Sequence, residues 1–234
     1  EFNDHMSECR TCEGVFRSDH LIDEKHPNPD SLSGVEIDEV ISGNDVTCPN
    51  CGGNDWSPAR PMNLMFPTTI GAMRSGREAY MRPETAQGMF MLYPSLFRHF
   101  KQKLPFGALQ TGRGYRNEIS PRQGMIRLRE FNMAELEYFI DPEAPPVGDL
   151  SRWGSPVEML SDPEGEHPGV HNITFSDALD SGIVRHPTVA WFLARTWEFL
   201  VNVGIDSTKI RFRQHTGTEM AHYASDCWDC EIFG

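Results

Sequence analysis

One charged stretch, residues 116–135, constrains the fold of this chain more than any other feature of its sequence. Two segments in which apolar and polar residues alternate flank a turn-prone centre, Ser120-Pro121 and Gln123-Gly124. This pattern predicts a strand, a loop and a second strand. The stretch also holds four arginines and three carboxylates, so one interpretation is an exposed, charged hairpin.

The order of the side chains favours a second interpretation, a ligand-binding sheet face. Alternate side chains of a strand point to the same side, so we expect Arg116 beside Glu118, and Phe131 beside Glu135 and Glu137. A face with an arginine, an aromatic ring and several carboxylates is not simple core, because each buried charge needs a partner. Such a face offers a cation for phosphate, a ring for a base and carboxylates for an ammonium group.

The composition limits the partners of the chain. Its 34 acidic and 21 basic residues give a net charge of −13, and only four of the basic residues are lysines. This charge does not attract a polyanion such as RNA, so any nucleic-acid contact needs a local basic patch. A lysine-poor, acidic surface would also suit a protein kept soluble in concentrated salt. The sequence has no run of 18 apolar residues and no signal-peptide pattern, so we expect a cytoplasmic protein with no membrane segment.

Six cysteines form three C-x-x-C pairs, which in a chain without a secretory signal favours metal binding or buried thiols over disulfides. The first two pairs resemble zinc knuckles, and together they supply four sulfurs for a tetrahedral structural zinc site. These four residues are Cys9, Cys12, Cys48 and Cys51. The 35 residues between the pairs require an inserted loop, and we expect its acidic part, 23–45, to be poorly ordered. For the third pair, Cys227 and Cys230, buried structural thiols are favoured over a metal site.

The rest of the chain predicts a mixture of helices and strands in four segments. They are 1–60, the zinc-knuckle insertion with its acidic loop; 61–141, a core with the charged hairpin; 142–186, an insertion rich in Pro, Gly, Ser and Asp; and 187–234, the continued core. One helix is expected from about Arg82, with Pro83 in its first turn and a kink at Pro94, and another from Pro187 to Gly204. Strands are expected within 63–71, 209–215 and 222–232.

Several sequence phrases resemble one enzyme family. Arg116-Asn117-Glu118, followed by a loop and by Arg127-x-x-x-Phe131-x-x-x-Glu135, resembles motif 2 of class II aminoacyl-tRNA synthetases. The surrounding phrases resemble glycyl-tRNA synthetases in particular, and the first two cysteine pairs resemble the zinc-binding insertion of their archaeal-type members. These phrases are Asn63-Leu64-Met65-Phe66, Arg82-Pro83-Glu84-Thr85-Ala86-Gln87-Gly88, Ser120-Pro121-Arg122-Gln123-Gly124, Arg211-Phe212-Arg213-Gln214-His215, Glu219-Met220-Ala221-His222-Tyr223-Ala224 and Asp226-Cys227-Trp228-Asp229.

The resemblance implies an α+β fold, an antiparallel sheet flanked by helices with a small zinc-ribbon-like insertion. It also implies a glycine–tRNA ligase, which uses ATP with Mg²⁺ to convert glycine to glycyl-adenylate and passes the glycyl group to tRNA(Gly). The ATP-binding residues so implied are Arg116 for the α-phosphate, Arg127 for the γ-phosphate, Phe131 and Glu118 for adenine, and Asn117, Arg129 and Glu130. The other implied site residues are Glu84, Phe131, Glu135 and Glu137 for glycine, Arg122 for the tRNA acceptor stem, and Cys9, Cys12, Cys48 and Cys51 for structural Zn²⁺.

The same resemblance implies a homodimer in the full-length protein, and alternatives stay open. The chain begins without Met and stops at Phe233-Gly234, and motifs 1 and 3 of the family are not visible, so we expect a fragment that is not a competent synthetase alone. One alternative is a non-catalytic synthetase-like paralogue, such as a polymerase accessory or regulatory subunit, which would be expected to lose the ATP-binding side chains. Others are a class II synthetase for another small amino acid and a zinc-ribbon nucleic-acid binder, which the net charge disfavours.

Overall fold

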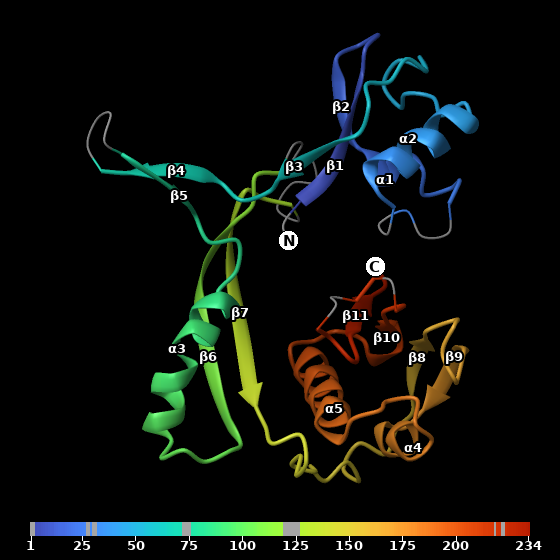
Figure 1. Cartoon of the computed structure of the whole chain (residues 1–234). Coiled ribbons are helices and arrows are strands. Elements are labelled where there is room, and N and C mark those ends of the chain that lie inside the picture. The colour runs from blue at the N-terminus through green and yellow to red at the C-terminus, as the bar shows by residue number, and fades with distance from the viewer. Residues whose placement is uncertain are drawn as a thin grey trace. The chain divides into compact units, whose positions relative to one another are not determined.

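The computed structural model of the chain divides into two compact units, Glu1–Phe139 and Ile140–Gly234, which are described separately (Figure 1). The structure describes residues 3–26, 29, 32–71, 76–118, 127–217, 219–220 and 223–234. Within these ranges, no helix is long and apolar enough to cross a membrane.

The first unit begins with a small three-stranded sheet that carries the cysteines. Its strands are β1 (Asn3–Cys9), β2 (Gly14–Arg17) and β3 (Arg60–Asn63), which run antiparallel in the order β2-β1-β3. Two helices lie beside this sheet, α1 (Ser18–Leu21) and α2 (Gly34–Gly43). The cluster of buried apolar side chains here is Ile22, Ile37, Ile41 and Val46.

The expectation of poor order over 23–45 is wrong for the α2 part of that segment. Ser33 and Glu36 form a capping box, in which the Ser33 side chain accepts from the Glu36 amide and the Glu36 carboxylate accepts from the Ser33 amide. Ile37 and Ile41, four positions apart on one helix face, are buried in the cluster. The acidic composition of this segment therefore did not predict disorder correctly. A capping box starts α2, and the packing of Ile37 and Ile41 stabilises it.

The segment after β3 forms two short strands and one helix. β4 (Pro67–Ile70) pairs antiparallel with β5 (Arg77–Tyr80), so the strand expected within 63–71 is split between β3 and β4. The helix expected from Arg82 is α3 (Ala86–His99), which leaves Pro83 before its first turn instead of within it. Pro94 lies inside α3 and does not end it.

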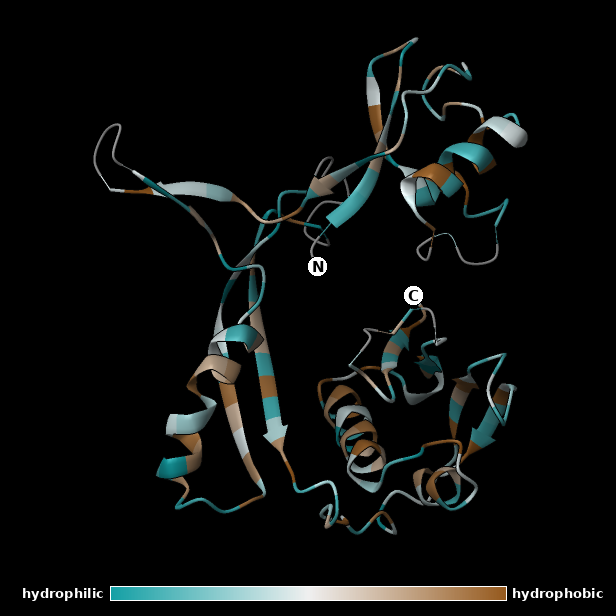
Figure 2. Cartoon of the chain, viewed as in Figure 1, coloured by the Kyte–Doolittle hydropathy of each residue, from teal (hydrophilic) through white to brown (hydrophobic). Residues whose placement is uncertain are grey.

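The predicted hairpin is confirmed as β6 (Phe106–Tyr115) and β7 (Glu130–Phe139), an antiparallel pair in which Gly114 faces Phe131 and Phe106 faces Phe139. Apolar and polar residues alternate along β7 (Figure 2). α3 packs on one end of a hairpin face, where the ring of Tyr93 lies 4.9 Å from that of Phe139 and 6.1 Å from that of Phe106. The opposite end of the same face, around Gly114 and Phe131, lies beyond this aromatic packing.

The second unit packs two helices and a four-stranded sheet around one core. The sheet order is β11 (Trp228–Ile232), β10 (Ile210–Gln214), β8 (Val157–Ser161) and β9 (Gly169–Ile173), with β10 parallel to β8 and the other pairs antiparallel. The helices are α4 (Phe175–Asp180) and α5 (Pro187–Asn202), and a 3-10 turn, Ser207–Lys209, precedes β10. Phe175, Met159 and Phe212 are fully buried in the core.

The predictions for this unit have mixed outcomes. α5 and β10 agree with the expected helix and strand, and Gly204 follows α5 with a φ of 101°. β11 covers the last part of the strand expected over 222–232, and His222 lies outside the described residues. Interpreting 142–186 as an insertion with weak periodicity underestimated it, because β8, β9 and α4 supply Met159 and Phe175 to the core.

Candidate active site

The alternation of side chains predicted for the second strand of the hairpin is present along β7. Phe131, Met133, Glu135 and Glu137 are partly buried on one side of β7, whereas the residues that alternate with them, Asn132, Ala134 and Leu136, are exposed. The Arg116 guanidinium carbon lies 5.5 Å from the centroid of the Phe131 ring, so the cation and the ring share this side. We call the side that bears Phe131, Glu135 and Glu137 the floor of the site.

Arg116 and Glu118 follow the end of β6, which stops at Tyr115, so strand alternation does not place them as predicted. The Arg116 amide donates to the Arg129 carbonyl at 3.0 Å, which extends the hairpin pairing by one bond. The Glu118 amide then donates to the Arg116 carbonyl at 2.8 Å, a local turn. The Asn117 amide donates to the Leu64 carbonyl at 2.6 Å, which ties this turn to the segment after β3.

Two of the predicted ATP-binding residues have structural partners of their own. Arg129 donates from Nε to the Glu118 carbonyl at 2.8 Å and so closes the base of the loop. Glu130 forms an ion pair with Arg113 and is exposed with it on the hairpin face opposite Phe131. The structure therefore separates Glu130 from the floor, although the two residues are sequence neighbours, because successive strand side chains alternate.

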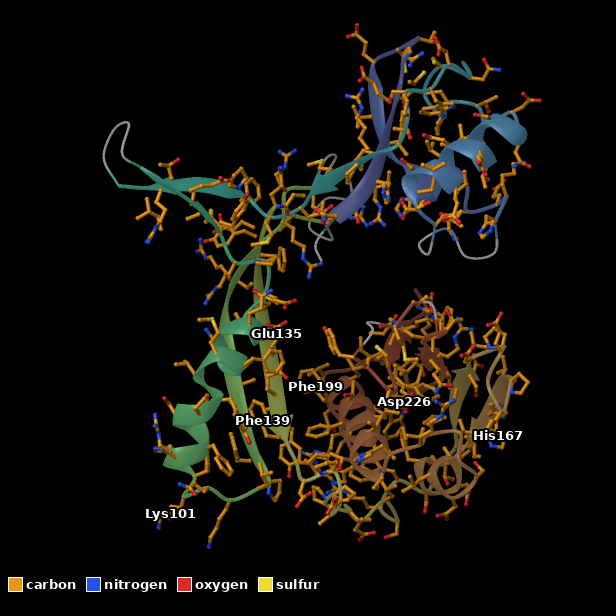
Figure 3. The ribbon with its side chains drawn as sticks, viewed as in Figure 1. Lys101, Glu135, Phe139, His167, Phe199 and Asp226 are labelled. Carbon is orange, nitrogen blue, oxygen red and sulfur yellow. The ribbon has the colours of Figure 1, made fainter. Side chains whose placement is uncertain are left out.

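An acidic group occupies the floor beside the start of α3. One oxygen of Glu135, Oε2, accepts from the amides of Thr85 at 2.6 Å and Ala86 at 2.9 Å and from the Thr85 hydroxyl. Glu135 is labelled on β7 in Figure 3, near the start of α3. These bonds place the carboxylate at the positive end of the helix dipole.

The other two carboxylates of this group are Glu84 and Glu137. Burial, and then the charge of Glu135, raise the pKa of Glu84, and Arg116 opposes the shift. Burial, followed by the charges of Glu135 and Glu84, raises the pKa of Glu137. The three carboxylates therefore lie close enough to repel one another, with Arg116 near Glu84. A bound cation would relieve that repulsion.

A cavity of about 500 Å³ lies between the hairpin base and the cysteine-bearing sheet. Glu118 and Arg127 line one side of it, and Phe16, Arg17 and His20 are among the residues that line the other. The structure thus brings Glu118 and Arg127 to one cavity, and their roles in ATP binding stay a prediction. Arg122 lies outside the described residues.

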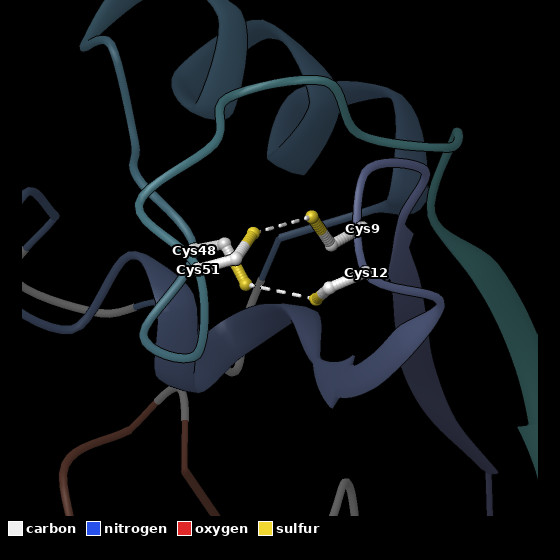
Figure 4. Close-up of side chains that lie close together, drawn as sticks. All are labelled: Cys9, Cys12, Cys48 and Cys51. Atoms are coloured by element: carbon white, nitrogen blue, oxygen red, sulfur yellow. Dashed lines mark hydrogen bonds between the residues drawn. The ribbon is translucent and has the colours of Figure 1, made fainter.

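The first two C-x-x-C pairs converge in a four-sulfur centre (Figure 4). The Cys9 and Cys51 sulfurs are 3.6 Å apart and those of Cys12 and Cys48 are 3.7 Å apart, and all four ligand atoms lie within 4.8 Å of one another. A tetrahedral zinc ion with Zn–S bonds of about 2.3 Å separates its sulfurs by about 3.8 Å, so the centre fits this ion.

The backbone around the second knuckle supports metal binding. The Asn50 amide donates to the Cys48 sulfur, and Gly52 adopts a φ of 73°, which a side chain would disfavour.

The two thiols of the first knuckle have pKa values shifted in opposite directions. Burial acts to raise the pKa of Cys9, but backbone and thiol hydrogen bonds outweigh it and lower that pKa to about 6. A Gly14 backbone hydrogen bond acts to lower the pKa of Cys12, yet burial and the three other thiols raise it to about 12.

The third cysteine pair differs from the first two. Cys227 and Cys230 are partly buried, burial raises the pKa of both, and Cys230 packs against the core of the second unit. In the part of the chain that the structure describes, they join no group of potential metal ligands. The two thiols are thus less buried than predicted, and their structural role stays a prediction.

Sequence reasoning missed two residues that hold the acidic group together, Thr85 and Arg82. Thr85 directly precedes α3, a position where Thr commonly caps a helix, but its side chain makes no capping bond and donates to Glu135 instead, so the capping signal does not predict this contact. Arg82 donates from Nε to the Arg113 carbonyl at 2.9 Å. No local pattern in the sequence indicates that contact, since it joins residues 31 positions apart.

Comparisons with known proteins identify the relatives of the chain. Residues 69–149 match the tRNA synthetase class II core domain (G, H, P, S and T). The chain is 48% identical to the glycine–tRNA ligase of Methanothrix thermoacetophila over 99% of the chain and 40% of the relative. It is 46% identical to those of Methanocaldococcus jannaschii and Archaeoglobus fulgidus, over 99% of the chain and 41% and 40% of the relatives. The chain therefore contains a segment of the class II tRNA synthetase core domain and is homologous over almost its whole length to about 40% of the length of archaeal glycine–tRNA ligases.

Proposed function

We propose that this chain supplies the ATP- and glycine-binding floor of a glycine–tRNA ligase. The chain spans about 40% of the length of the curated relatives it matches, so this activity belongs to the whole protein. The single observation that carries the proposal is the grouping of Arg116, over the Phe131 ring, with the carboxylates of Glu135 and Glu137 on β7 and of Glu84 from the segment before α3. A cation, an aromatic ring and an acidic group match phosphate, adenine and ammonium respectively.

The first reaction is the formation of glycyl-adenylate. A glycine carboxylate oxygen forms a bond to the ATP α-phosphorus, and the bond from that phosphorus to the pyrophosphate oxygen breaks. Arg116 binds the α-phosphate with its planar donor fork and stabilises the charge that develops there. Arg127 binds the γ-phosphate, Phe131 stacks on adenine, and Glu118 accepts from the exocyclic amine. Mg²⁺ enters with ATP as part of the substrate, and the glycyl group then passes to the 3′ end of tRNA(Gly).

The acidic group binds the glycine ammonium. Glu84, Glu135 and Glu137 repel one another when the site is empty, and a positive charge between them offsets that repulsion. An ammonium also donates three hydrogen bonds, which suits a site with several carboxylate oxygens. The walls of this site exclude larger side chains by size, the mechanism by which alanine and serine are rejected.

The four-cysteine centre holds a structural zinc ion. The fit of the sulfur distances to a tetrahedron and the amide donated to Cys48 support this assignment. Its donor set is closed, with four protein thiolates, which is typical of structural sites. The ion stabilises residues 1–60 as a separate zinc-knuckle segment beside the core.

The remaining partners, the compartment and the division into segments follow from the resemblance to the relatives. Arg122 contacts the tRNA acceptor stem, the whole protein is a homodimer, and its compartment is the cytoplasm. Residues 61–141 and 187–234 form the catalytic core, and 142–186 is an excursion from it whose strands and helix pack with the second part of that core.

The test is ATP–pyrophosphate exchange by the full-length protein with glycine, alanine and serine in turn, for wild type and Arg116→Ala. We expect exchange with glycine that is at least about 100-fold slower in the variant. A preference for alanine or serine would assign a different small amino acid, and an unaffected Arg116→Ala would refute the site. Absence of exchange with any amino acid would favour a non-catalytic paralogue.

A further inference from the structure

The segment 82–86, between β5 and α3, is fastened to both strands of the hairpin. At its first end, Arg82 donates from Nε to the Arg113 carbonyl at 2.9 Å, and the Tyr115 amide donates to the Arg82 carbonyl at 2.9 Å. At its other end, the amides of Thr85 and Ala86 and the Thr85 hydroxyl all donate to Glu135. One end is thus held by β6 and the other by β7.

The anchors are specific to the residues present. Thr85 is 1% exposed, so its hydroxyl has no access to water as an alternative partner. Gly112 of β6 lies under the Arg82 guanidinium, and a Cβ at that position would clash with Nη2 of Arg82. A side chain at Gly112 would therefore have to displace the end of the Arg82 side chain, and the second anchor combines the Thr85 hydroxyl with two backbone amides.

Glu84 lies between the two anchors and carries the one carboxylate that this segment brings to the floor. Its charge and the charges of Glu135 and Glu137 act on one another, and Arg116 acts on it as well. On an unanchored loop, the Glu84 carboxylate would move into water, because solvation lowers its repulsion with the neighbouring carboxylates. The two anchors prevent this movement.

We propose that Thr85 is a positioning residue of the glycine site, which holds Glu84 among the hairpin carboxylates by fastening residues 82–86 to Glu135. The inference deepens the proposed function and rests on it. It also gives the two oxygens of Glu135 different roles, because Oε2 accepts from the amides of Thr85 and Ala86. Only Oε1 of Glu135 is left to face an ammonium group, beside the carboxylates of Glu84 and Glu137.

The test compares Thr85→Val, which removes the hydroxyl and keeps the shape, with Thr85→Ser, which restores the hydroxyl. The readout is the KM for glycine and for ATP in ATP–pyrophosphate exchange by the full-length protein. We expect Thr85→Val to raise the KM for glycine about tenfold and the KM for ATP less than about twofold. Thr85→Ser should return the glycine KM to within about twofold of wild type.

A second variant addresses the other anchor without touching Thr85. Gly112→Ala displaces the Arg82 guanidinium, and we expect it also to raise the KM for glycine more than that for ATP. Gly107→Ala is its matched control, because Gly107 lies on the same strand but on the exposed hairpin face. A rise in the glycine KM confined to Gly112→Ala supports the proposal.

Three outcomes would overturn it. They are a wild-type glycine KM in Thr85→Val, an equal rise of both KM values in that variant, and a failure of Thr85→Ser to restore the glycine KM. These are distinct from failure of the proposed function, in which the wild-type protein itself shows no glycine-dependent exchange and the inference falls with it. Equal unfolding temperatures of Thr85→Val and Thr85→Ser show that a difference in the glycine KM comes from the site and not from a loss of stability.

Discussion

The guanidinium carbon of Arg116 lies 5.5 Å from the centroid of the Phe131 ring, across the open end of the β6–β7 hairpin. Arg116 follows β6 and Phe131 is the second residue of β7, so the contact joins the two sides of the loop base. It orders the cation over the ring before any ligand arrives. A base that stacks on Phe131 would thereby meet a phosphate-binding group already in position.

This relationship predicts that Arg116→Lys is not a conservative change. Lysine keeps the charge but lacks the planar fork that stacks on a ring and binds phosphate in two places. We expect ATP–pyrophosphate exchange by the full-length protein to fall about tenfold or more in Arg116→Lys, and about 100- to 1,000-fold in Arg116→Ala. Steady-state exchange at saturating glycine measures both.

Arg113 provides the matched control for these variants. It lies three residues before Arg116 in the same hairpin and pairs with Glu130 on the opposite face. Arg113→Lys should leave exchange within about twofold of wild type, since exposed ion pairs contribute little. An equal loss of exchange in Arg113→Lys and Arg116→Lys would mean that exchange depends on the hairpin as a whole and not on the face that bears Phe131.

The four-cysteine centre predicts loss of zinc on removal of one sulfur. Cys48 is a buried member of the centre, and Cys48→Ser replaces its sulfur by a hydroxyl that can still accept from the Asn50 amide but is a poor zinc ligand. We expect the zinc content to fall by about one ion per chain and the unfolding temperature to fall by several degrees, because a structural zinc site contributes folding free energy directly. Elemental analysis and a thermal scan measure these changes.

Cys227→Ser applies the same chemical change outside the centre. Cys227 is partly buried in the second unit and joins none of the four clustered sulfurs. Its zinc content should equal that of wild type, and so should the response of its unfolding temperature to a chelator. Retention of all zinc by Cys48→Ser would contradict the assignment of the centre.

How far the sequence predicted this structure depended on the range of the interactions. Strand alternation was enough for the floor residues of β7, because Phe131 and Glu135 lie inside a regular strand. It failed at Glu118, which follows the strand end, where the Arg129 and Leu64 carbonyls decide the backbone path instead. The Thr85–Glu135 contact joins positions 50 apart, so no local pattern contained it.

The missed helix α2 leads to a prediction about stability. Ile37 is 1% exposed in the cluster beside the cysteine-bearing sheet, whereas Val35, in the same helix, is 69% exposed. Ile37→Ala leaves a cavity there, and we expect it to destabilise this region by about 2–5 kcal/mol. Hydrogen exchange of the α2 amides under native conditions measures the loss as faster exchange.

Val35→Ala is the control for that change. It shortens a β-branched side chain in the same helix without opening a cavity, so the expected effect is within about 0.5 kcal/mol. Similar acceleration of α2 exchange by both variants would contradict the role of the Ile37 cluster, because alanine has the higher helix propensity and cannot accelerate exchange through propensity.

The acidic group predicts opposite effects on binding and stability at Glu137. Burial, followed by the charges of Glu135 and Glu84, raises the pKa of Glu137 above its ordinary value of 4.5. A carboxyl with a raised folded-state pKa favours folding most below its unfolded-state pKa, and this contribution is lost as the pH rises through the folded-state pKa. At pH 7 the ionised Glu137 therefore weakens the fold relative to a neutral glutamine.

We expect Glu137→Gln to raise the unfolding temperature at pH 7 by a few degrees at most, and this gain to shrink as the pH falls toward 4.5. The same variant should raise the KM for glycine about tenfold, because an ammonium loses a charged acceptor. Glu143→Gln makes the same change of charge at an exposed position and should do neither. If the three carboxylates repel one another, removal of the Glu137 charge stabilises the fold. A lower unfolding temperature of Glu137→Gln at pH 7 would therefore contradict this repulsion, and with it the proposed ammonium site.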